Sequence, residues 1–133
     1  MKKKIKSNRA HCLLPIAAAL IVLLLFRTVF LLGYVPTASM EPTLKAGSLV
    51  LGNRLDRRFE VGDVVIFQHD GQLLVKRIAA VEGDIVTHKG VGIAVPAGTC
   101  YVLGDNAEDS YDSRYWDEPF VPESAIVAKV WLP

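Results

Sequence analysis

The sequence of 133 residues has few of the residues that stabilise disulfide-rich or zinc-binding domains. It contains two cysteines and three histidines, too few for a disulfide framework and without the spacing of a zinc site. Cys12 lies in a long apolar run and Cys100 lies far along the chain, so we expect no bond between them. Cys100 is expected to be a small buried hydrophobic residue. We expect neither a metal nor another cofactor.

Acidic residues are absent from residues 1–11, where five basic residues give a charge of +5. Arg27 adds one positive charge, and residues 28–133 hold nine bases against fourteen acids, which gives −5 and a net charge of +1 for the whole chain. A protein that binds nucleic acid through a basic domain needs a cationic face, so this distribution excludes that class and predicts no nucleic-acid partner.

Charged residues are also absent from positions 12–26, and after Arg27 the chain stays apolar to Val35. A helix over about residues 13–32 would be roughly 30 Å long, which matches the hydrocarbon core of a bilayer. We therefore expect a membrane anchor at residues 12–34. Arg27 would lie about five residues from its outer end, close enough for the side chain to reach the interface.

A cleaved secretory signal is the alternative interpretation of this segment. Such a signal needs small residues three and one positions before the cut, and Pro36 occupies the first of these places for a cut after Ala38. The sequence thus favours an uncleaved single-pass anchor in the cell membrane. The basic tail, residues 1–11, is expected to stay in the cytoplasm and residues 35–133 to lie outside it.

Short β-rich runs, and almost no helical periodicity, follow the apolar segment. Gly, Pro and Asp separate these runs, and Asp70-Gly71 is the best signal for a tight hairpin turn. We predict a mainly β fold, in which one transmembrane helix precedes a small all-β domain of short antiparallel strands. The expected strands are 48–53, 64–67, 72–81, 85–87, 90–95, 99–103 and 124–131.

Nucleophilic catalysis needs an activated side chain and a base within hydrogen-bond reach. Strand alternation places Lys76 on the same face as Leu74 and Ile78, so its amine is expected to lose solvation and its pKa to fall. Ser39 is the candidate nucleophile, because prolines on both sides hold its segment rigid. Two alternatives stay open: Lys76 is a solvated surface side chain, and the segment around Ser39 is only a linker that leaves the membrane helix.

Two further sets of residues are candidates for chemistry. A Ser-His-Asp triad would have to use His69 or His88, which we expect to be exposed turn residues. The acidic segment 104–116 is expected to be a solvated loop. A calcium site is the alternative, although the spacing of the acidic residues is not that of an EF-hand loop. Within it, Asp112 and Arg114 can pair and make the loop rigid.

Four sequence boxes, in this order behind an anchor, resemble those of the bacterial type I signal peptidases, which are membrane-bound Ser-Lys peptidases. The boxes are Ser-Met-Glu-Pro-Thr-Leu at 39–44, Gly-Asp-Val-Val-Ile-Phe at 62–67, Lys-Arg-Ile at 76–78 with Gly-Asp at 83–84, and Gly-Asp-Asn at 104–106 followed by Ser-Tyr-Asp-Ser-Arg at 110–114. The resemblance covers nearly the whole chain. It is strong because all four boxes are present in register.

The resemblance implies a role for each matching residue. Ser39 would attack the scissile carbonyl and Lys76 would take its proton, while the Ser39 N–H and the Thr37 hydroxyl would form the oxyanion hole. The family often has Ser at the position of Thr37. Among the supporting residues, Ser110 would orient the Lys76 amine, and Asp112 with Arg114 would hold that loop.

The same resemblance implies substrates and partners. The substrates would be exported preproteins with small residues at −3 and −1, cut at the outer face of the lipid bilayer near the export translocon. Larger family members carry a second β-domain that residues 87–99 replace here, so residues 35–133 are expected to be a minimal peptidase domain. Two alternatives stay open: a dedicated peptidase for one pilus, conjugation or secretion substrate, and a non-catalytic membrane-anchored assembly module.

Overall fold

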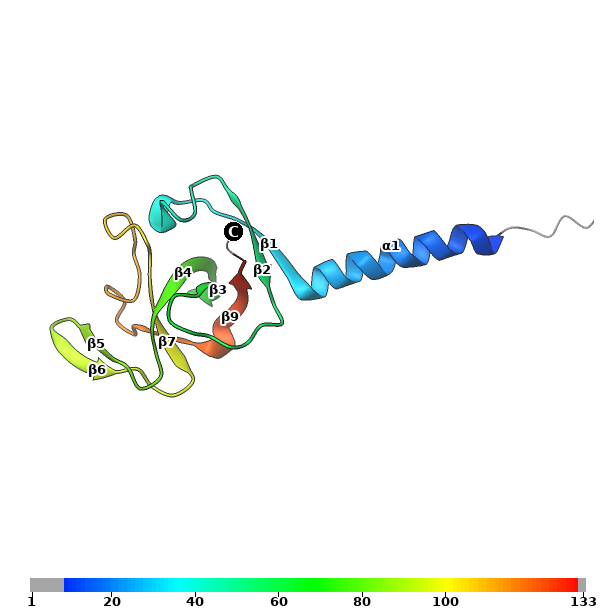
Figure 1. The fold of residues 1–133 in the computed structure, drawn as a ribbon. Helices are drawn as coiled ribbons and strands as arrows, with labels where there is room; N and C mark the ends of the chain where they lie inside the picture. The colour runs from blue at the N-terminus through cyan, green and yellow to red at the C-terminus, as the bar shows by residue number, and fades with distance from the viewer. Residues whose placement is uncertain (1–8, 132–133) are drawn as a thin grey trace, which may run out of the picture.

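A computed structural model describes residues 9–131 of the chain, as one long helix and a β-domain (Figure 1). The predicted basic tail falls mostly outside the described residues, so its position and its cytoplasmic location stay predictions. The element order confirms the predicted fold class, a mainly antiparallel β-domain behind a single N-terminal apolar helix.

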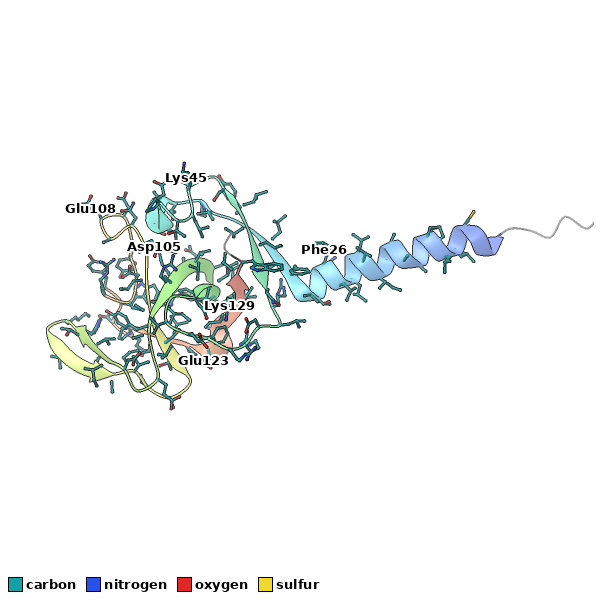
Figure 2. All side chains as sticks on the ribbon, in the orientation of Figure 1. Phe26, Lys45, Asp105, Glu108, Glu123 and Lys129 are labelled. Atoms are coloured by element: carbon teal, nitrogen blue, oxygen red, sulfur yellow. The ribbon has the colours of Figure 1, made fainter. Side chains whose placement is uncertain are left out.

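Helix α1 (Arg9–Val29) extends away from the β-domain (Figure 1). Its stretch Cys12–Val29 has a mean hydropathy of 2.5 and none of it is buried against the protein, so by length and composition it can cross a membrane. Figure 2 shows side chains projecting from this helix on all sides. The expected end of the helix near residue 32 was wrong by three residues.

The helix ends early because the chain that follows it belongs to the sheet. Strand β1 (Phe30–Tyr34) pairs antiparallel with β2 (Leu49–Asn53), from Phe30 opposite Asn53 to Tyr34 opposite Leu49. The β-branched Thr28 and Val29 also lower helix propensity at this point. Residues 30–34, expected in the anchor, therefore form an edge strand of the β-domain.

Seven strands form the main sheet, in the order β1-β2-β9-β3-β4-β7-β8, and every pairing in it is antiparallel. The strands not yet given are β3 (Val64–His69), β4 (Gln72–Val81), β7 (Thr99–Leu103), β8 (Phe120–Pro122) and β9 (Ile126–Val130). A separate hairpin consists of β5 (Ile85–His88) and β6 (Val91–Ala94). Two short 3-10 helices, η1 (Ala38–Met40) and η2 (Glu123–Ala125), complete the described elements.

The turn between β3 and β4 is the one predicted from Asp70-Gly71. Both residues have positive φ, 48° and 77°, as a two-residue turn of type I′ requires, and His69 lies opposite Gln72. This turn fixes the register of β4 for its whole length. The predicted alternation in β4 is confirmed, because Lys76, Ile78 and Ala80 are buried on one face.

Hydrophobic side chains pack on both faces of the central strands. One cluster contains Phe67, Ile78 and Trp116, with the fully buried Cys100 among its members. The other joins residues of β2 and β3 to Val35, Met40 and Leu44, which lie in the segment after β1. The burial of Val35 before Ser39 and of Met40 after it anchors both sides of the serine to the sheet. Cys12 and Cys100 are both free, as predicted.

Candidate functional site

Ser39 lies in η1, in the segment that runs from β1 to β2. Met40 next to it is buried in the core, and Ser39 itself is 8% exposed. Two hydrogen bonds from Asn106 hold this segment: its backbone N–H donates to the Ser39 carbonyl (3.0 Å) and its side-chain amide donates to the Ala38 carbonyl (3.1 Å). The serine is therefore fixed by the core on one side and by the loop after β7 on the other.

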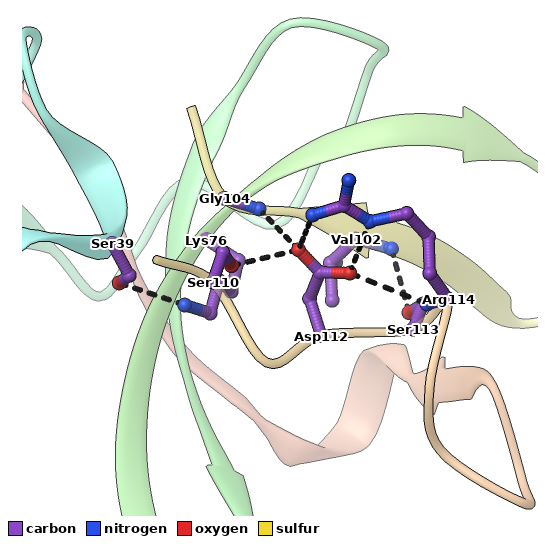
Figure 3. Close-up of polar contacts among 8 residues, drawn as sticks. All are labelled: Ser39, Lys76, Val102, Gly104, Ser110, Asp112, Ser113 and Arg114. Atoms are coloured by element: carbon purple, nitrogen blue, oxygen red, sulfur yellow. Dashed lines mark hydrogen bonds and ion pairs between the residues drawn. The ribbon is translucent and has the colours of Figure 1, made fainter. Parts of the chain in front are cut away.

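Lys76 reaches Ser39 from the middle of β4. Its Nζ lies 2.8 Å from the Ser39 Oγ and donates a hydrogen bond to it (Figure 3). The residue is 4% exposed. The fold thus brings together the two side chains that the sequence predicts as nucleophile and base, although 37 positions separate them.

Burial lowers the pKa of Lys76 below the ordinary value of 10.5. The carboxylate of Asp112 acts in the opposite direction, and the nearby charge of Arg114 lowers the pKa further. A neutral amine can accept a proton, whereas an ammonium cannot. The environment of Lys76 therefore favours the form that could act as a base towards Ser39.

Thr37 lies directly before η1, beside the serine hydroxyl. Its Oγ1 is 3.3 Å from the Ser39 Oγ and donates to it. Ser39 is in the first turn of η1, where a backbone N–H has no partner within the helix. The Thr37 hydroxyl therefore lies beside the Ser39 hydroxyl. The oxyanion hole that the family resemblance implies for Thr37 and the Ser39 N–H stays a prediction.

Asp112 is the centre of the loop that backs Lys76, and its side chain is fully buried. It accepts hydrogen bonds from the Ser110 hydroxyl (2.7 Å) and the Gly104 N–H (2.9 Å), and it forms a bidentate pair with Arg114 (2.9 and 2.7 Å; Figure 3). Burial alone would raise the pKa of Asp112, but these bonds outweigh it and hold the pKa below 3.8. The predicted Asp112–Arg114 pair is confirmed.

Ser110 is buried, and Figure 3 draws it between Lys76 and Asp112. Its hydroxyl donates to Asp112 rather than to the lysine. The predicted role of Ser110 in orienting the amine stays a prediction, and the structure adds that Asp112 holds the Ser110 hydroxyl in place.

Sequence reasoning gave no role to Arg77, Asp105 and Gly104, which connect the boxes. Arg77, on the opposite face of β4 from Lys76, forms a bidentate pair with Asp105 (2.7 and 2.6 Å) and donates to the Gly62 carbonyl. A Cβ added to Gly104 would overlap Ser110 and would lie 2.5 Å from the Ser39 carbonyl oxygen. The signal for these residues was the unexplained Gly-Asp-Asn run at 104–106.

The histidines differ from their prediction as exposed turn residues. His69 is half-buried and stacks on Trp116, with ring centroids 3.8 Å apart. His88 is also half-buried, and both its ring nitrogens are shielded from solvent. Among the described residues, the base that forms a hydrogen bond with the Ser39 hydroxyl is Lys76 and not a histidine. Within residues 9–131 no group of three or more His, Cys, Asp or Glu side chains is placed to hold a metal.

Two cavities meet at Ser39 and Lys76. The first, of about 260 Å³, lies between β1 and the start of β4, and apolar side chains such as Val35, Met40 and Ile66 line it. The second, of about 340 Å³, is lined by more polar and aromatic residues, among them His69, Asp109, Tyr111 and Trp116. The serine hydroxyl can therefore be approached along two grooves, one lined mainly by aliphatic side chains and the other by polar and aromatic side chains.

Comparison with known proteins identifies sequence relatives for nearly the whole chain. A family described as "Signal peptidase, peptidase S26" matches residues 9–95 and 89–133. A "Probable signal peptidase I-1" of Synechocystis sp. is 28% identical over 130 residues, covering 71% of this chain and 65% of the relative. The "Mitochondrial ATP-independent inner membrane protease subunit 1a" of Arabidopsis thaliana is 35% identical over 114 residues, covering 71% of this chain and 67% of the relative.

A third relative, the "Thylakoidal processing peptidase 1, chloroplastic" of Arabidopsis thaliana, is 30% identical over 141 residues, covering 74% of this chain and 41% of the relative. The chain thus spans about two thirds or less of the length of these relatives.

Proposed function

The chain belongs to the signal peptidase family, peptidase S26, and on this premise we propose that it is a membrane-anchored serine endopeptidase that removes N-terminal signal peptides from exported preproteins. The observation that carries the proposal is the contact of 2.8 Å between the Ser39 Oγ and the Lys76 Nζ in a buried site. Catalysis by a serine needs a base at this distance.

In the proposed reaction, neutral Lys76 accepts the hydroxyl proton as the Ser39 oxygen attacks the scissile carbonyl. The resulting ammonium then gives this proton to the leaving amine, and an acyl-enzyme ester remains on Ser39. Water, deprotonated by Lys76, attacks the ester. Lys76 returns this proton to the departing Ser39 oxygen, and the signal peptide leaves with a free carboxylate. The Ser39 N–H and the Thr37 hydroxyl would stabilise the negative oxygen of each tetrahedral intermediate.

The apolar groove would bind the signal peptide before the cut. Strand β4 pairs with β3 along residues 72–77, and its described pairing with β7 begins only at Arg77, so residues 72–76 pair on one side alone. An extended substrate could therefore add to the free edge of β4 beside Lys76.

Anchoring through α1 would place this groove at the membrane, where the apolar core of a signal peptide ends. We propose that the β-domain is extracytoplasmic, with the tail in the cytoplasm because of its five basic residues. Protease treatment of spheroplasts should then digest the β-domain. Protection of that domain in sealed spheroplasts, with digestion after lysis, would contradict the topology.

The deciding experiment is cleavage of a preprotein with Ala at −3 and −1 by the purified full-length protein in detergent. Ser39→Ala and Lys76→Ala should each lower kcat/KM by about 10⁴-fold or more, because the two residues act as one unit. Ser48→Ala and Lys45→Ala, at an exposed turn, are the matched controls and should keep full activity. Substantial cleavage by either site variant would overturn the proposal. If the proposal holds, a panel of preproteins distinguishes a general signal peptidase from one dedicated to a single substrate.

A further inference from the structure

Two arginines lie together where helix α1 meets the β-domain. Arg27 is in the last turn of α1, and Arg54 directly follows β2. Both line one groove of about 470 Å³, whose other walls are apolar side chains, including Leu23, Phe26 and Leu51. None of the residues that line this groove in the described chain is acidic.

Arg54 is held in position by the backbone of the helix end. Its N–H donates to the Val29 carbonyl (2.8 Å), and its Nε donates to the Phe30 carbonyl (3.3 Å). The two terminal nitrogens of the guanidinium remain for another acceptor. The Arg27 side chain is exposed, and no described hydrogen bond or ion pair to residues 12–131 occupies it. The groove thus presents two positive charges that the described protein does not neutralise.

The position of the groove along the membrane normal follows from its neighbours. The apolar stretch of α1 ends at Val29, so Arg27 lies within one helical turn of the end of the hydrocarbon region. Trp131 is 68% exposed and stacks on Phe30 (centroids 6.4 Å apart), and exposed tryptophans collect at the level of lipid headgroups. In Figure 2, Phe26 marks this end of the helix, beside the β-domain.

We propose that this groove binds an anionic phospholipid, with its phosphate between Arg27 and Arg54 and an acyl chain along Leu23 and Phe26. A guanidinium matches a phosphate with two parallel N–H donors, and apolar walls next to it suit an acyl chain rather than a free ion. The inference rests on the membrane anchoring in the proposed function. Binding there would fix the tilt of the β-domain, and so the height of Ser39 above the bilayer.

The test is native mass spectrometry of the full-length protein in detergent, titrated with dioleoyl phosphatidylglycerol. Arg27→Gln and Arg54→Gln should each weaken binding about fivefold, and the double variant about thirtyfold, since each basic residue near a lipid surface contributes about 1 kcal/mol. The control is Lys45→Gln with Arg58→Gln, which removes the same charge from exposed positions outside the groove. It should change binding less than twofold.

Several outcomes would overturn the inference. Equal weakening of lipid binding in the control and in the groove variants would indicate general attraction between charges. The basic tail contributes to such attraction equally in the wild type and in all variants. Competition by millimolar inorganic phosphate would indicate a phosphate site and not a lipid site. If Arg54→Gln fails to fold, Arg27→Gln alone decides, because that side chain holds no other described element. Extraction of the protein from membranes by alkaline carbonate would instead contradict the anchor itself.

Discussion

In the proposed mechanism, the charge of a single amine decides whether Ser39 can be activated. Lys76 lies on the buried face of β4, so its charged form loses hydration when the protein folds. This loss lowers the pKa of the lysine. Asp112 and Arg114 act on it with opposite signs, and both belong to the loop that packs behind it. The proton affinity of Lys76 is therefore set by that loop as well as by burial.

This arrangement predicts how the activity depends on pH. Cleavage should rise with pH as Lys76 loses its proton, with a midpoint below 10.5 because the pKa is lowered. Arg114→Gln removes a positive charge that lowers this pKa, so the midpoint should move to higher pH. Asp112→Asn removes a charge that raises it, so the midpoint should move to lower pH. The measurement is kcat/KM against pH for the wild type and both variants.

Opposite shifts are the signature of charge, because a folding defect lowers the activity without moving the midpoint. Arg58→Gln, which changes an exposed charge on the loop before β3, is the control and should leave the midpoint unchanged. A shift in the same direction for Arg114→Gln and Asp112→Asn would contradict this account of the lysine.

Gly104 is expected to be required for the position of the serine. A methyl group there would overlap Ser110 and press on the Ser39 carbonyl, 2.5 Å away, so Gly104→Ala should displace the two loops from each other. A displacement of about 1 Å at a reacting group can cost about 10²-fold in rate. We expect a loss of this size in kcat. Gly92→Ala is the control, since its new methyl group would make only an ordinary contact of 3.7 Å, and wild-type behaviour of Gly104→Ala would contradict the prediction.

At the scale of elements, the loop from Gly104 to Arg114 is held by one buried carboxylate. Asp112→Asn would leave Arg114 without its ionic partner and weaken the bonds from Ser110 and Gly104. Breaking a buried ion pair on one side costs about 3–5 kcal/mol, so we expect a loss of about 3 kcal/mol in the free energy of unfolding at pH 7, measured by urea denaturation.

The pH dependence of this loss has a definite sign. The pKa of Asp112 is lowered in the folded protein, so its stabilisation is present above the unfolded value, near pH 4, and is lost as the pH falls below it. The wild type and Asp112→Asn should therefore become equally stable in acid. Asp109→Asn, on the exposed part of the loop, should change the stability by less than about 0.5 kcal/mol. A loss below 1 kcal/mol for Asp112→Asn at pH 7 would contradict the central place given to Asp112.

Most of the strands could be predicted from the sequence, because alternation and turn residues are local signals. Strand β4 and strand β7 have the predicted bounds, and the turn at Asp70 and Gly71 fixes the register. Strand β1 was missed because its residues are as apolar as the helix before them, and only pairing with β2 separates the two. Strand β8 has three residues, the last of them Pro122, and carries too little pattern of its own.

The candidate site was predictable in its residues but not in its connections. Ser39 and Lys76 could be proposed from their local surroundings and from the family boxes. The pair of Arg77 with Asp105 joins positions 28 apart, and the bonds of Asn106 to the serine segment join positions more than 65 apart. Such contacts depend on how loops pack in three dimensions, which periodicity does not report.

At the scale of the whole molecule, helix and β-domain share the segment where they meet. Strand β1 continues directly from α1, contributes Leu31 to the core cluster of β2 and β3, and lines the apolar groove beside Ser39. The predicted division into an anchor at 12–34 and a peptidase domain at 35–133 therefore assigns the whole of β1 to the anchor, although this strand pairs with β2 of the β-domain. We propose a boundary between Val29 and Phe30.

Two truncated proteins test this boundary. A fragment of residues 30–133 keeps β1, whereas a fragment of residues 35–133 loses five residues of strand pairing and the burial of Leu31. Losing the half-buried Leu31 and a strand edge should cost about 2–3 kcal/mol, which corresponds to a fall of roughly 10–20 °C in Tm for a domain of this size. Thermal unfolding followed by circular dichroism measures this difference, with detergent added equally to both fragments. Equal Tm values would show that β1 contributes nothing to the domain and would return the boundary to Tyr34.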